Sequence, residues 1–595
     1  MTTPTPLKVP TIQAEPGPLT RSGHSAIAEW LGELPQGNPD ACAATLMQVI
    51  HKTNRAPLQR TTRFKVAEQF RPVINRICDA LVKRYRNSGL PLDPEAERQA
   101  HAINRLQREL TVAFRHAVND FLVDGRTTVE RRREAPVAFQ RALLAQGRAL
   151  LEAYRIYQPE PQGFWRSLHT LYGRAEALQM QAAPIEGDKG SDETALSVKQ
   201  AYLRTVILSL ANPYHLMQGE AEELYRRIGR WAHFIRLHVP KESDSLSGRF
   251  VLDLGSDFPP HYRAAQQKHH LPMSSPRLLE IGQLSEALDQ QIAYLDDHLR
   301  QSRHANTLSE RMQRNMYARF QNALAGRQER THARQSSMGQ VRMVSGLSPC
   351  HFMLNGKNPF QPEEDEARWR RKVAGASGGQ EGLALVDDSD DNPDNGMAHR
   401  TARFKSFDVD ADDVWTKANR INIDEEPTEA QTSTPRIQSV TLRRKNLSEG
   451  GMALLHPQGC TLRTRVGELV AYGNPNDPET PESWRLATIR WLRTQPEQGI
   501  EIGLEFIDDS AHAAASKAIS GPGNGSAYLR TLIVPRVNPM MESTTLITPA
   551  SVYDVGTRLA LNLGELVLNV QLTDMIGSTR LYAHFRFKII PANER

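Results

Sequence analysis

The chain has 595 residues, which is too long for one hydrophobic core and suggests roughly three or four domains. Its formal net charge is only +5, from 73 basic and 68 acidic residues, and this balance argues against a dedicated nucleic-acid or membrane-surface binder. The four cysteines are far apart and form no CxxC pattern, so neither a disulfide framework nor a zinc site is expected.

The N-terminal residues 1–23 are rich in proline and threonine and predict a disordered tail. They lack a basic stretch followed by an apolar core, so they do not resemble a secretion signal. No run in the sequence approaches the roughly 18 apolar residues that a membrane-spanning helix needs. We therefore expect a cytoplasmic protein without membrane insertion.

Residues 24–325 carry a helical pattern. The clearest segment opens at Asp93, which can cap a helix, followed by Pro94 and two acidic residues in the first turn. Two further apolar stripes lie at 164–178 and 225–235, whereas residues 249–254 predict one short strand without an identified partner. Amphipathic helices need partners, so we expect a helical bundle. The stripe after Pro94 consists of Ile103, Leu106, Leu110, Phe114, Ala117 and Phe121.

Residues 356–434 interrupt this order with clusters of aspartate and glutamate and few periodic apolar positions. Such a segment buries too little apolar surface to offset the entropy cost of ordering it, so we expect a largely disordered insertion. The cluster at 387–391 lacks the glycine and the closing glutamate of a calcium-binding EF-hand loop. Calcium binding is therefore not expected.

From about residue 436 the apolar period changes to two and turn residues become frequent, which predicts β structure. Residues 511–525 are expected to be a glycine-rich linker, and residues 526–595 a second β unit. The clearest strand of that unit presents alternate apolar residues on one face. These residues are Leu581, Ala583, Phe585, Phe587 and Ile589.

A short polar motif, Asn446-Leu447-Ser448-Glu449-Gly450-Gly451, lies between two strand-like segments at 437–442 and 452–455. An Asn-x-Ser-x-x-Gly motif between two strands resembles the signature of PilZ domains. The strand that ends on Arg490-Trp491 and the Gly-x-x-Phe pattern at 503–506 resemble the middle and closing strands of the PilZ barrel.

PilZ domains also carry an Arg-x-x-x-Arg pair ahead of their first strand. Arg330 and Arg334 have this spacing and precede a strand-like segment at 340–347. Arg443 and Arg444 do not fit this motif, because they are adjacent and lie after the first strand. A second candidate pair near residue 400 has the wrong spacing. This order implies a barrel over residues 326–510 that is interrupted by the acidic insertion. An insertion of about 80 residues is tolerable because the cost of closing a loop grows only logarithmically with its length. The candidate pair with the wrong spacing consists of Arg400 and Arg403.

The resemblance implies a multi-domain α + β protein, in which a helical bundle is followed by a PilZ-like antiparallel β-barrel and a second small β unit. It also implies a bacterial receptor for cyclic di-GMP. The planar arginine fork suits phosphate groups and guanine edges, the short polar side chains suit a guanine edge, and a glycine permits close backbone approach. The implied ligand-binding residues are Arg330, Arg334, Asn446, Ser448 and Gly451.

PilZ proteins of this type are generally linked to motility, pili, biofilm and surface attachment. We therefore expect a signalling effector that couples cyclic di-GMP to a protein partner held by the helical region. No nucleophile–base pair, metal motif or phosphate loop occurs in the sequence, so neither an enzyme nor a cofactor is expected, and no nucleic acid polymer is an expected partner. Two alternatives stay open: a degenerate PilZ adaptor that docks proteins without nucleotide, and an activity that resides in the helical region.

Overall fold

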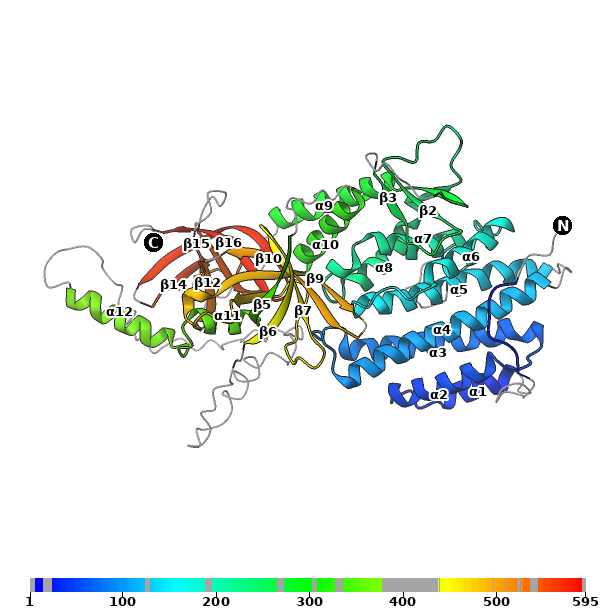
Figure 1. The fold of residues 1–595 in the computed structure, drawn as a ribbon, viewed down its shortest axis with the longest axis horizontal. Coiled ribbons are helices and arrows are strands. Elements are labelled where there is room, and N and C mark those ends of the chain that lie inside the picture. Colours follow the sequence, from blue (N-terminus) through cyan, green and yellow to red (C-terminus); the bar gives the residue numbers. More distant parts are fainter. Residues whose placement is uncertain are drawn as a thin grey trace, which may run out of the picture.

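The computed structural model shows a helical part at one end of the molecule, one β-barrel in the middle and a second β-barrel at the other end (Figure 1). This arrangement confirms the multi-domain α + β fold class expected from the sequence. The structure describes residues 6–13, 24–123, 129–187, 195–264, 272–301, 308–326, 335–376, 437, 439–495, 497–508, 510–521, 525, 527–535, 544–564 and 566–590.

Long helices dominate the chain up to residue 234 and pack side by side around one hydrophobic core (Figure 1). Their bounds are α1 His24–Glu33, α2 Pro39–Thr53, α3 Arg60–Tyr85, α4 Pro94–Val123, α5 Val129–Arg155, α6 Phe164–Ala177, α7 Val198–Leu210, η1 Pro213–His215, α8 Glu220–Trp231 and η2 Ala232–Phe234.

Helix α4 shows how the sequence sets this bundle. The Asp93 carboxylate accepts hydrogen bonds from the backbone N–H groups of Ala96 at 2.8 Å and Glu95 at 3.1 Å, and so caps the first turn. The predicted apolar stripe is buried from Ile103 to Ala117. Because α2, α3 and α5 all pack against α4, that stripe forms the centre of the bundle core.

A four-stranded antiparallel sheet follows the bundle, in the order β1-β4-β2-β3. Strand β2 corresponds to the strand predicted at 249–254, and it now has partners on both sides. Those partners were missed because β3 is only three residues long and β4 contains only two apolar residues, Leu278 and Leu279, so neither carries a recognisable pattern. The strands are β1 Arg236–His238, β2 Arg249–Asp253, β3 His261–Arg263 and β4 Pro276–Glu280.

Two further helices, α9 Gly282–Gln301 and α10 Leu308–Leu324, pack against each other beside the sheet. Helix α10 places Met316, Phe320 and Leu324 in the core of the helical part. These three residues recur at four-residue steps, so this face of α10 is turned to the bundle.

The first barrel is closed and antiparallel, in the strand order β10-β7-β6-β5-β8-β9. Strand β5 precedes the acidic segment and β6 follows it, yet the two strands are neighbours, with Val341 opposite Leu442. The strands are β5 Gln335–Ser345, β6 Val440–Ser448, β7 Gly451–His456, β8 Leu469–Gly473, β9 Arg485–Gln495 and β10 Gly499–Asp508, and a 3-10 turn, η3 Pro481–Ser483, precedes β9.

Two helices lie where none was expected. Helix α11, Leu347–Leu354, follows the strand predicted at 340–347 and lies within the region that we assigned to the barrel. Helix α12, Pro362–Ala376, opens the segment that we assigned to a disordered insertion. The start of α12 explains the difference, because a proline and three acidic residues in the first turn favour a helix N-terminus. Residues 377–434 of the predicted insertion lie outside the described residues.

The second barrel is also closed and antiparallel, in the order β11-β12-β13-β16-β15-β14. Its first strand, β11, lies within residues 511–525, so the linker expected there is wrong for most of its length. The inward positions of β11 are small residues such as Ala514 and Ala518, which give a weak hydrophobic pattern. The strands are β11 His512–Ser520, β12 Leu529–Val534, β13 Thr545–Pro549, β14 Arg558–Asn562, β15 Val567–Ser578 and β16 Tyr582–Ile589.

The first barrel shares a core with the helical part. Leu90 and Thr464 exchange backbone N–H···O bonds of 2.8 Å in both directions, and the N–H of Thr494 donates to the carbonyl of Tyr157 at 2.8 Å. Leu90 and Tyr157 also belong to the same hydrophobic cluster as the barrel interior. These contacts make the helical part and the barrel one packed unit.

The two barrels meet through a separate hydrophobic cluster, in which α11 is inserted between them. Cys350 and Met353 of α11 are buried there beside Trp484 of the first barrel and Ile547 of the second. The hydroxyl of Tyr582 also donates to Thr488 at 3.2 Å. The second barrel is therefore fixed against the first.

Among the described residues, no helix combines the length and the apolar character needed to cross a bilayer.

Candidate functional site

The polar motif at 446–451 forms a tight hairpin. Ser448, the last residue of β6, pairs with Gly451, the first residue of β7, so only two residues form the turn. The Ser448 hydroxyl donates to the Gly451 carbonyl at 3.0 Å, and the N–H of Phe506 donates to the Gly450 carbonyl at 3.0 Å. The hairpin tip is thus held by its own side chain and by β10.

Gly451 has a structural reason to be glycine. A Cβ at this position would lie 2.1 Å from the carbonyl oxygen of Leu504 on β10, a distance that no side chain tolerates. We expected the glycine to leave room for a ligand, but the backbone of the neighbouring strand takes that room. Gly451 therefore shapes the hairpin that presents Asn446 and Ser448.

Asn446 lies on the outer face of the barrel in a row of directly paired residues. Ser336 of β5 is opposite Asn446, Asn446 is opposite Ala453, Ala453 is opposite Gly503, and Gly503 is opposite Trp491. Directly paired residues point to the same face of a sheet. We call this row from Asn446 to Trp491 the shelf, and its two middle residues, Ala453 and Gly503, are themselves buried.

The Trp491 ring lies against Gly503, since a Cβ on that glycine would be 1.9 Å from the indole nitrogen of Trp491. The ring is half-buried. Asn446 is also half-buried, and within the part of the chain that the structure describes its side chain has no hydrogen-bond partner. An aromatic face and a free amide are thus present on one shelf.

The two predicted arginines, Arg330 and Arg334, lie outside the described residues. The structure does describe the strand that they precede, and its first residue, Gln335, is paired with Leu447 of the motif. Strand β5, which directly follows residue 334 in the chain, therefore begins beside the hairpin that contains Ser448. Of the five predicted site residues, Asn446, Ser448 and Gly451 are brought together, whereas the two arginines are not described.

Basic side chains continue along β6 from the hairpin. Arg443 is exposed and has no recorded partner among the described residues. The Arg444 guanidinium lies over Gly339 of β5, and its Nε donates to the Ser337 carbonyl at 3.4 Å. Lys445 forms an ion pair with Glu501. A positive surface therefore lies beside the shelf.

The acidic groups near the shelf are neutralised. Burial acts to raise the pKa of Glu501, but hydrogen bonds from Lys445 and Gln495 outweigh it and hold that pKa below its ordinary value. On the Ser448 side of the shelf, Glu505 pairs with the Nε of Arg490 at 2.8 Å. The shelf therefore presents no unpaired carboxylate from these positions to an anionic ligand.

The helical part borders the shelf at strand β9. The His215 ring lies with its centroid 6.5 Å from that of Trp491, and the Arg493 guanidinium lies 5.3 Å from the Tyr214 ring centroid. Our sequence analysis identified the Arg490-Trp491 strand end but did not assign Trp491, Ala453 or Gly503 to the site. The alternation of residues within a strand shows which side chains point outward. Only the pairing register of β6, β7, β10 and β9 shows that these outward residues lie in one row.

Other chemistries find little support. No cluster of three or more histidine, cysteine, aspartate or glutamate side chains within the described ranges has the arrangement of a metal site. The histidines with the lowest pKa values, such as His351 and His116 at about 4, are kept neutral chiefly by burial. The hairpin shelf is thus the surface where polar, aromatic and basic groups converge.

Three family models match consecutive parts of the chain. They are described as "Cyclic-di-GMP receptor FimW, N-terminal domain" for residues 25–242, "Cyclic-di-GMP receptor FimW, middle PilZ domain" for residues 249–513, and "FimW C-terminal beta-barrel domain" for residues 514–590. The second model covers strands β2 to β4 of the small sheet, α9, α10 and the first barrel together, whereas β1 falls within the first model. The third covers the second barrel.

Among curated proteins, the chain is similar to the cyclic-di-GMP receptor FimW of Pseudomonas aeruginosa. The two are 24% identical over 571 residues, which covers 94% of this chain and 90% of the relative. No solved structure matches the chain. The similarity therefore extends over the whole architecture and is not confined to the barrel motif.

Proposed function

The chain belongs to the family of large, multi-domain PilZ proteins, and on that premise we propose that it is a cyclic di-GMP receptor whose ligand binds at the β6–β7 hairpin of the first barrel. The observation that carries this proposal is the register of β5. Gln335 pairs with Leu447, so the chain bearing Arg330 and Arg334 joins the barrel beside Asn446 and Ser448.

The chemistry of the hairpin suits this ligand. Cyclic di-GMP carries two phosphates and two guanines. Arg330 and Arg334 would bind phosphate or the O6/N7 edge of guanine through two parallel hydrogen bonds. The Ser448 hydroxyl, whose hydrogen is donated to Gly451, can accept from a guanine N–H. The Asn446 amide can both donate and accept.

The shelf between Asn446 and Trp491 would receive one guanine. The base would stack on the half-buried Trp491 ring, which lies against Gly503, and stacking of a base on an aromatic side chain contributes about 1–3 kcal/mol. Arg443 adds a further cation beside the shelf. Trp491 and Arg443 were not among the site residues predicted from the motif alone.

We further propose that ligand binding is transmitted through α10. This helix is connected to β5 by residues 325–334, which contain both arginines. Its apolar face is packed in the helical core, while its Arg311 binds Asp554 of the second barrel at 2.6 Å and its Asn315 donates to Ser578 at 3.4 Å. Drawing the arginines onto the hairpin would therefore act on all three parts of the protein.

The cellular role follows from that coupling. We infer that the helical part docks a protein partner and that cyclic di-GMP tunes the docking in motility, pilus or surface-attachment control. The four cysteines are free thiols, which supports work in a reducing compartment such as the cytoplasm. A coupling free energy of about 1–3 kcal/mol is typical of such regulation.

Calorimetric titration of the purified full chain with cyclic di-GMP tests the proposal. We expect saturable binding that Arg334→Ala and Asn446→Ala weaken. The double variant Arg400→Ala/Arg403→Ala serves as the matched control, because it removes two arginines of the wrong spacing, and its affinity should equal that of the wild type. If wild type and Arg334→Ala both fail to bind, the chain is a ligand-free PilZ adaptor.

A further inference from the structure

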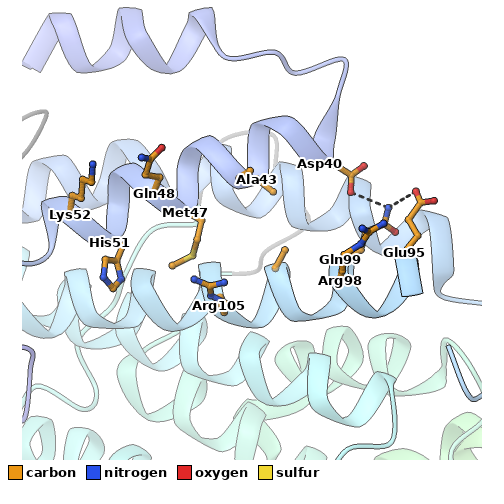
Figure 2. A pocket seen from close by; sticks show the side chains of 12 residues that line it. Asp40, Ala43, Met47, Gln48, His51, Lys52, Glu95, Arg98, Gln99 and Arg105 are labelled. Carbon is orange, nitrogen blue, oxygen red and sulfur yellow. Dashed lines mark hydrogen bonds between the residues drawn. The ribbon is translucent and has the colours of Figure 1, made fainter. Parts of the chain in front are cut away.

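A groove of about 680 Å³ lies between α2 and α4 in the helical part (Figure 2). The two helices run in the same direction. Gln99 donates to Asp40 at 3.1 Å near their starts, and His51 lies 2.8 Å from Glu109 further along. Several of the residues that line the space between the two helices are exposed, so the groove opens to solvent.

The floor of the groove is apolar and built from small side chains. From Asp40 to Lys52 the groove follows twelve helical steps of about 1.5 Å, or about 18 Å, which matches roughly three turns of a second helix. Alanine side chains leave the width that such a helix needs. The floor residues are Ala43, Ala44 and Met47 of α2 and Ala102 of α4.

The acidic side chains that line the groove are already engaged. Asp40 forms an ion pair with Arg84 and accepts from Gln99. Glu95 accepts from the same amide of Gln99 at 3.2 Å, and both bonds lie at one end of the groove (Figure 2). Neither carboxylate therefore neutralises the basic residues along the groove.

Basic side chains form a stripe along α4. Arg98, His101, Arg105 and Arg108 are exposed and follow one another at steps of three, four and three, so they share one face of the helix. Lys52 lies at the end of α2. Within the described part of the chain, none of these five side chains has a recorded partner.

We propose that this groove binds an acidic amphipathic helix of a partner protein. Apolar side chains at helical spacing would enter the alanine floor, and the carboxylates beside them would meet the stripe of Arg98, Arg105 and Lys52. The inference deepens the proposed function, on which it rests for its cellular meaning, by naming the surface and the chemistry of the partner.

Fluorescence anisotropy with the full chain tests the groove. The probe is a labelled model helix of about 16 residues, with leucine at i, i+3, i+4 and i+7 positions and glutamate on both flanks. A matched probe carries lysine in place of each glutamate. We expect the wild type to bind the acidic probe and not the basic one.

Charge reversal gives the decisive contrast. The double variant Arg98→Glu/Arg105→Glu should lower the affinity for the acidic probe by at least about tenfold, and it should bind the basic probe. The variant Ala44→Leu fills the floor of the groove without any change of charge, and it should lower the affinity for the acidic probe. The matched control, Arg166→Glu/Arg230→Glu on α6 and α8, reverses two exposed arginines outside the groove and should behave as wild type.

Three results would overturn the proposal. One is equal binding of the acidic probe by the groove and control variants. Another is displacement of that probe by a short single-stranded oligonucleotide at lower concentration than by unlabelled peptide, which would assign the stripe to nucleic acid. The third is much tighter binding when four aspartates of the chain's own acidic segment become asparagine, which would make that segment the occupant. Those aspartates are Asp408, Asp410, Asp412 and Asp413.

The same samples separate this inference from the receptor proposal. All groove variants should keep the wild-type affinity for cyclic di-GMP, because the groove residues lie on α2 and α4 and not at the hairpin. Failure of the wild type to bind cyclic di-GMP would overturn the receptor proposal alone and leave the peptide measurements valid.

Discussion

The two barrels of this protein share a strand number and a closed antiparallel form but differ in where their polar groups are used. In the first barrel, Asn446 and Ser448 face outward at a hairpin tip and keep bonding capacity for a ligand. In the second, Ser516 is bonded to Thr531 at 2.6 Å and accepts from the Tyr553 hydroxyl at its carbonyl, at 3.0 Å. Its polar groups satisfy one another inside the fold.

The difference shows that a barrel is a scaffold and that the ligand site depends on a few residues added to it. The first barrel also receives the chain from α10 next to its hairpin, whereas the second is continuous with β10 of the first barrel. We therefore expect variants in the interior of the second barrel to change stability, and variants of the polar and basic side chains at the hairpin of the first barrel to change affinity.

The largest effect is expected from the interior of the second barrel. Phe585 is fully buried, so Phe585→Ala should lower the free energy of unfolding by about 3–5 kcal/mol through the cavity it leaves. Phe587, which we expected to face the core equally, is only partly buried, and Phe587→Ala should cost about 1–2 kcal/mol. Urea unfolding measures both, and a larger loss for Phe587→Ala would contradict the observed packing.

The next effect belongs to the first barrel and concerns binding. Arg334→Ala should weaken cyclic di-GMP binding by about 2–4 kcal/mol, because it removes a charge-assisted contact, and should leave the melting temperature nearly unchanged. Calorimetry and thermal unfolding of the same samples give both numbers. Arg558→Ala on β14 of the second barrel is the control, and its ligand affinity should equal that of the wild type.

A pH effect is expected where the barrels meet. His351 is buried on α11, donates to the Ala514 carbonyl at 3.0 Å, and has its pKa lowered by burial to about 4. The unfolded chain therefore binds more protons between about pH 6.5 and pH 4, so stability is lost as the pH falls through that window.

Protonation linked to His351 should lower the free energy of unfolding by about 2–3 kcal/mol near pH 4.5. His584 in the second barrel has the same low pKa from burial, so His351→Gln should remove only part of the pH dependence. Urea titrations at pH 7 and pH 4.5 measure the difference. An unchanged pH dependence in His351→Gln would show that this histidine does not resist protonation in the fold.

The smallest effect compares one glycine in each barrel. Gly451→Ala should destabilise the first barrel by about 1–3 kcal/mol, because its Cβ would overlap the Leu504 carbonyl. A Cβ placed on Gly577 of β15 would meet no atom within 4 Å, so Gly577→Ala should be neutral or slightly stabilising. Urea unfolding of the two variants measures the contrast. Equal effects at both positions would contradict the strand spacing around the hairpin.

Much of the architecture could be predicted from periodicity. The stripe on α4 and the strand at 249–254 are both present in the structure. The linker at 511–525 was wrong because β11 buries alanine and serine, which carry little hydrophobic signal. Helix α12 differs from the predicted insertion because acidic clusters are common in disordered segments, yet acidic residues behind a proline are also typical of a helix start.

The candidate site was predicted only in part, for a physical reason. The local motif identified Asn446 and Ser448, since a short spacing is visible in the sequence itself. The shelf formed with Ala453, Gly503 and Trp491 depends on the register of four strands, and register follows from the whole barrel. The α2–α4 groove was missed for the same reason, because it exists only between two helices.

Hydrogen exchange of the full chain, with and without cyclic di-GMP, tests the central claim most directly. The account predicts that ligand slows exchange in peptides covering residues 327–340 and 444–455, while peptides from β11 and β12 of the second barrel stay unchanged. A change in α10 would support transmission to the helical part. Protection confined to the second barrel, or no protection at the β6–β7 hairpin despite saturating ligand, would contradict it.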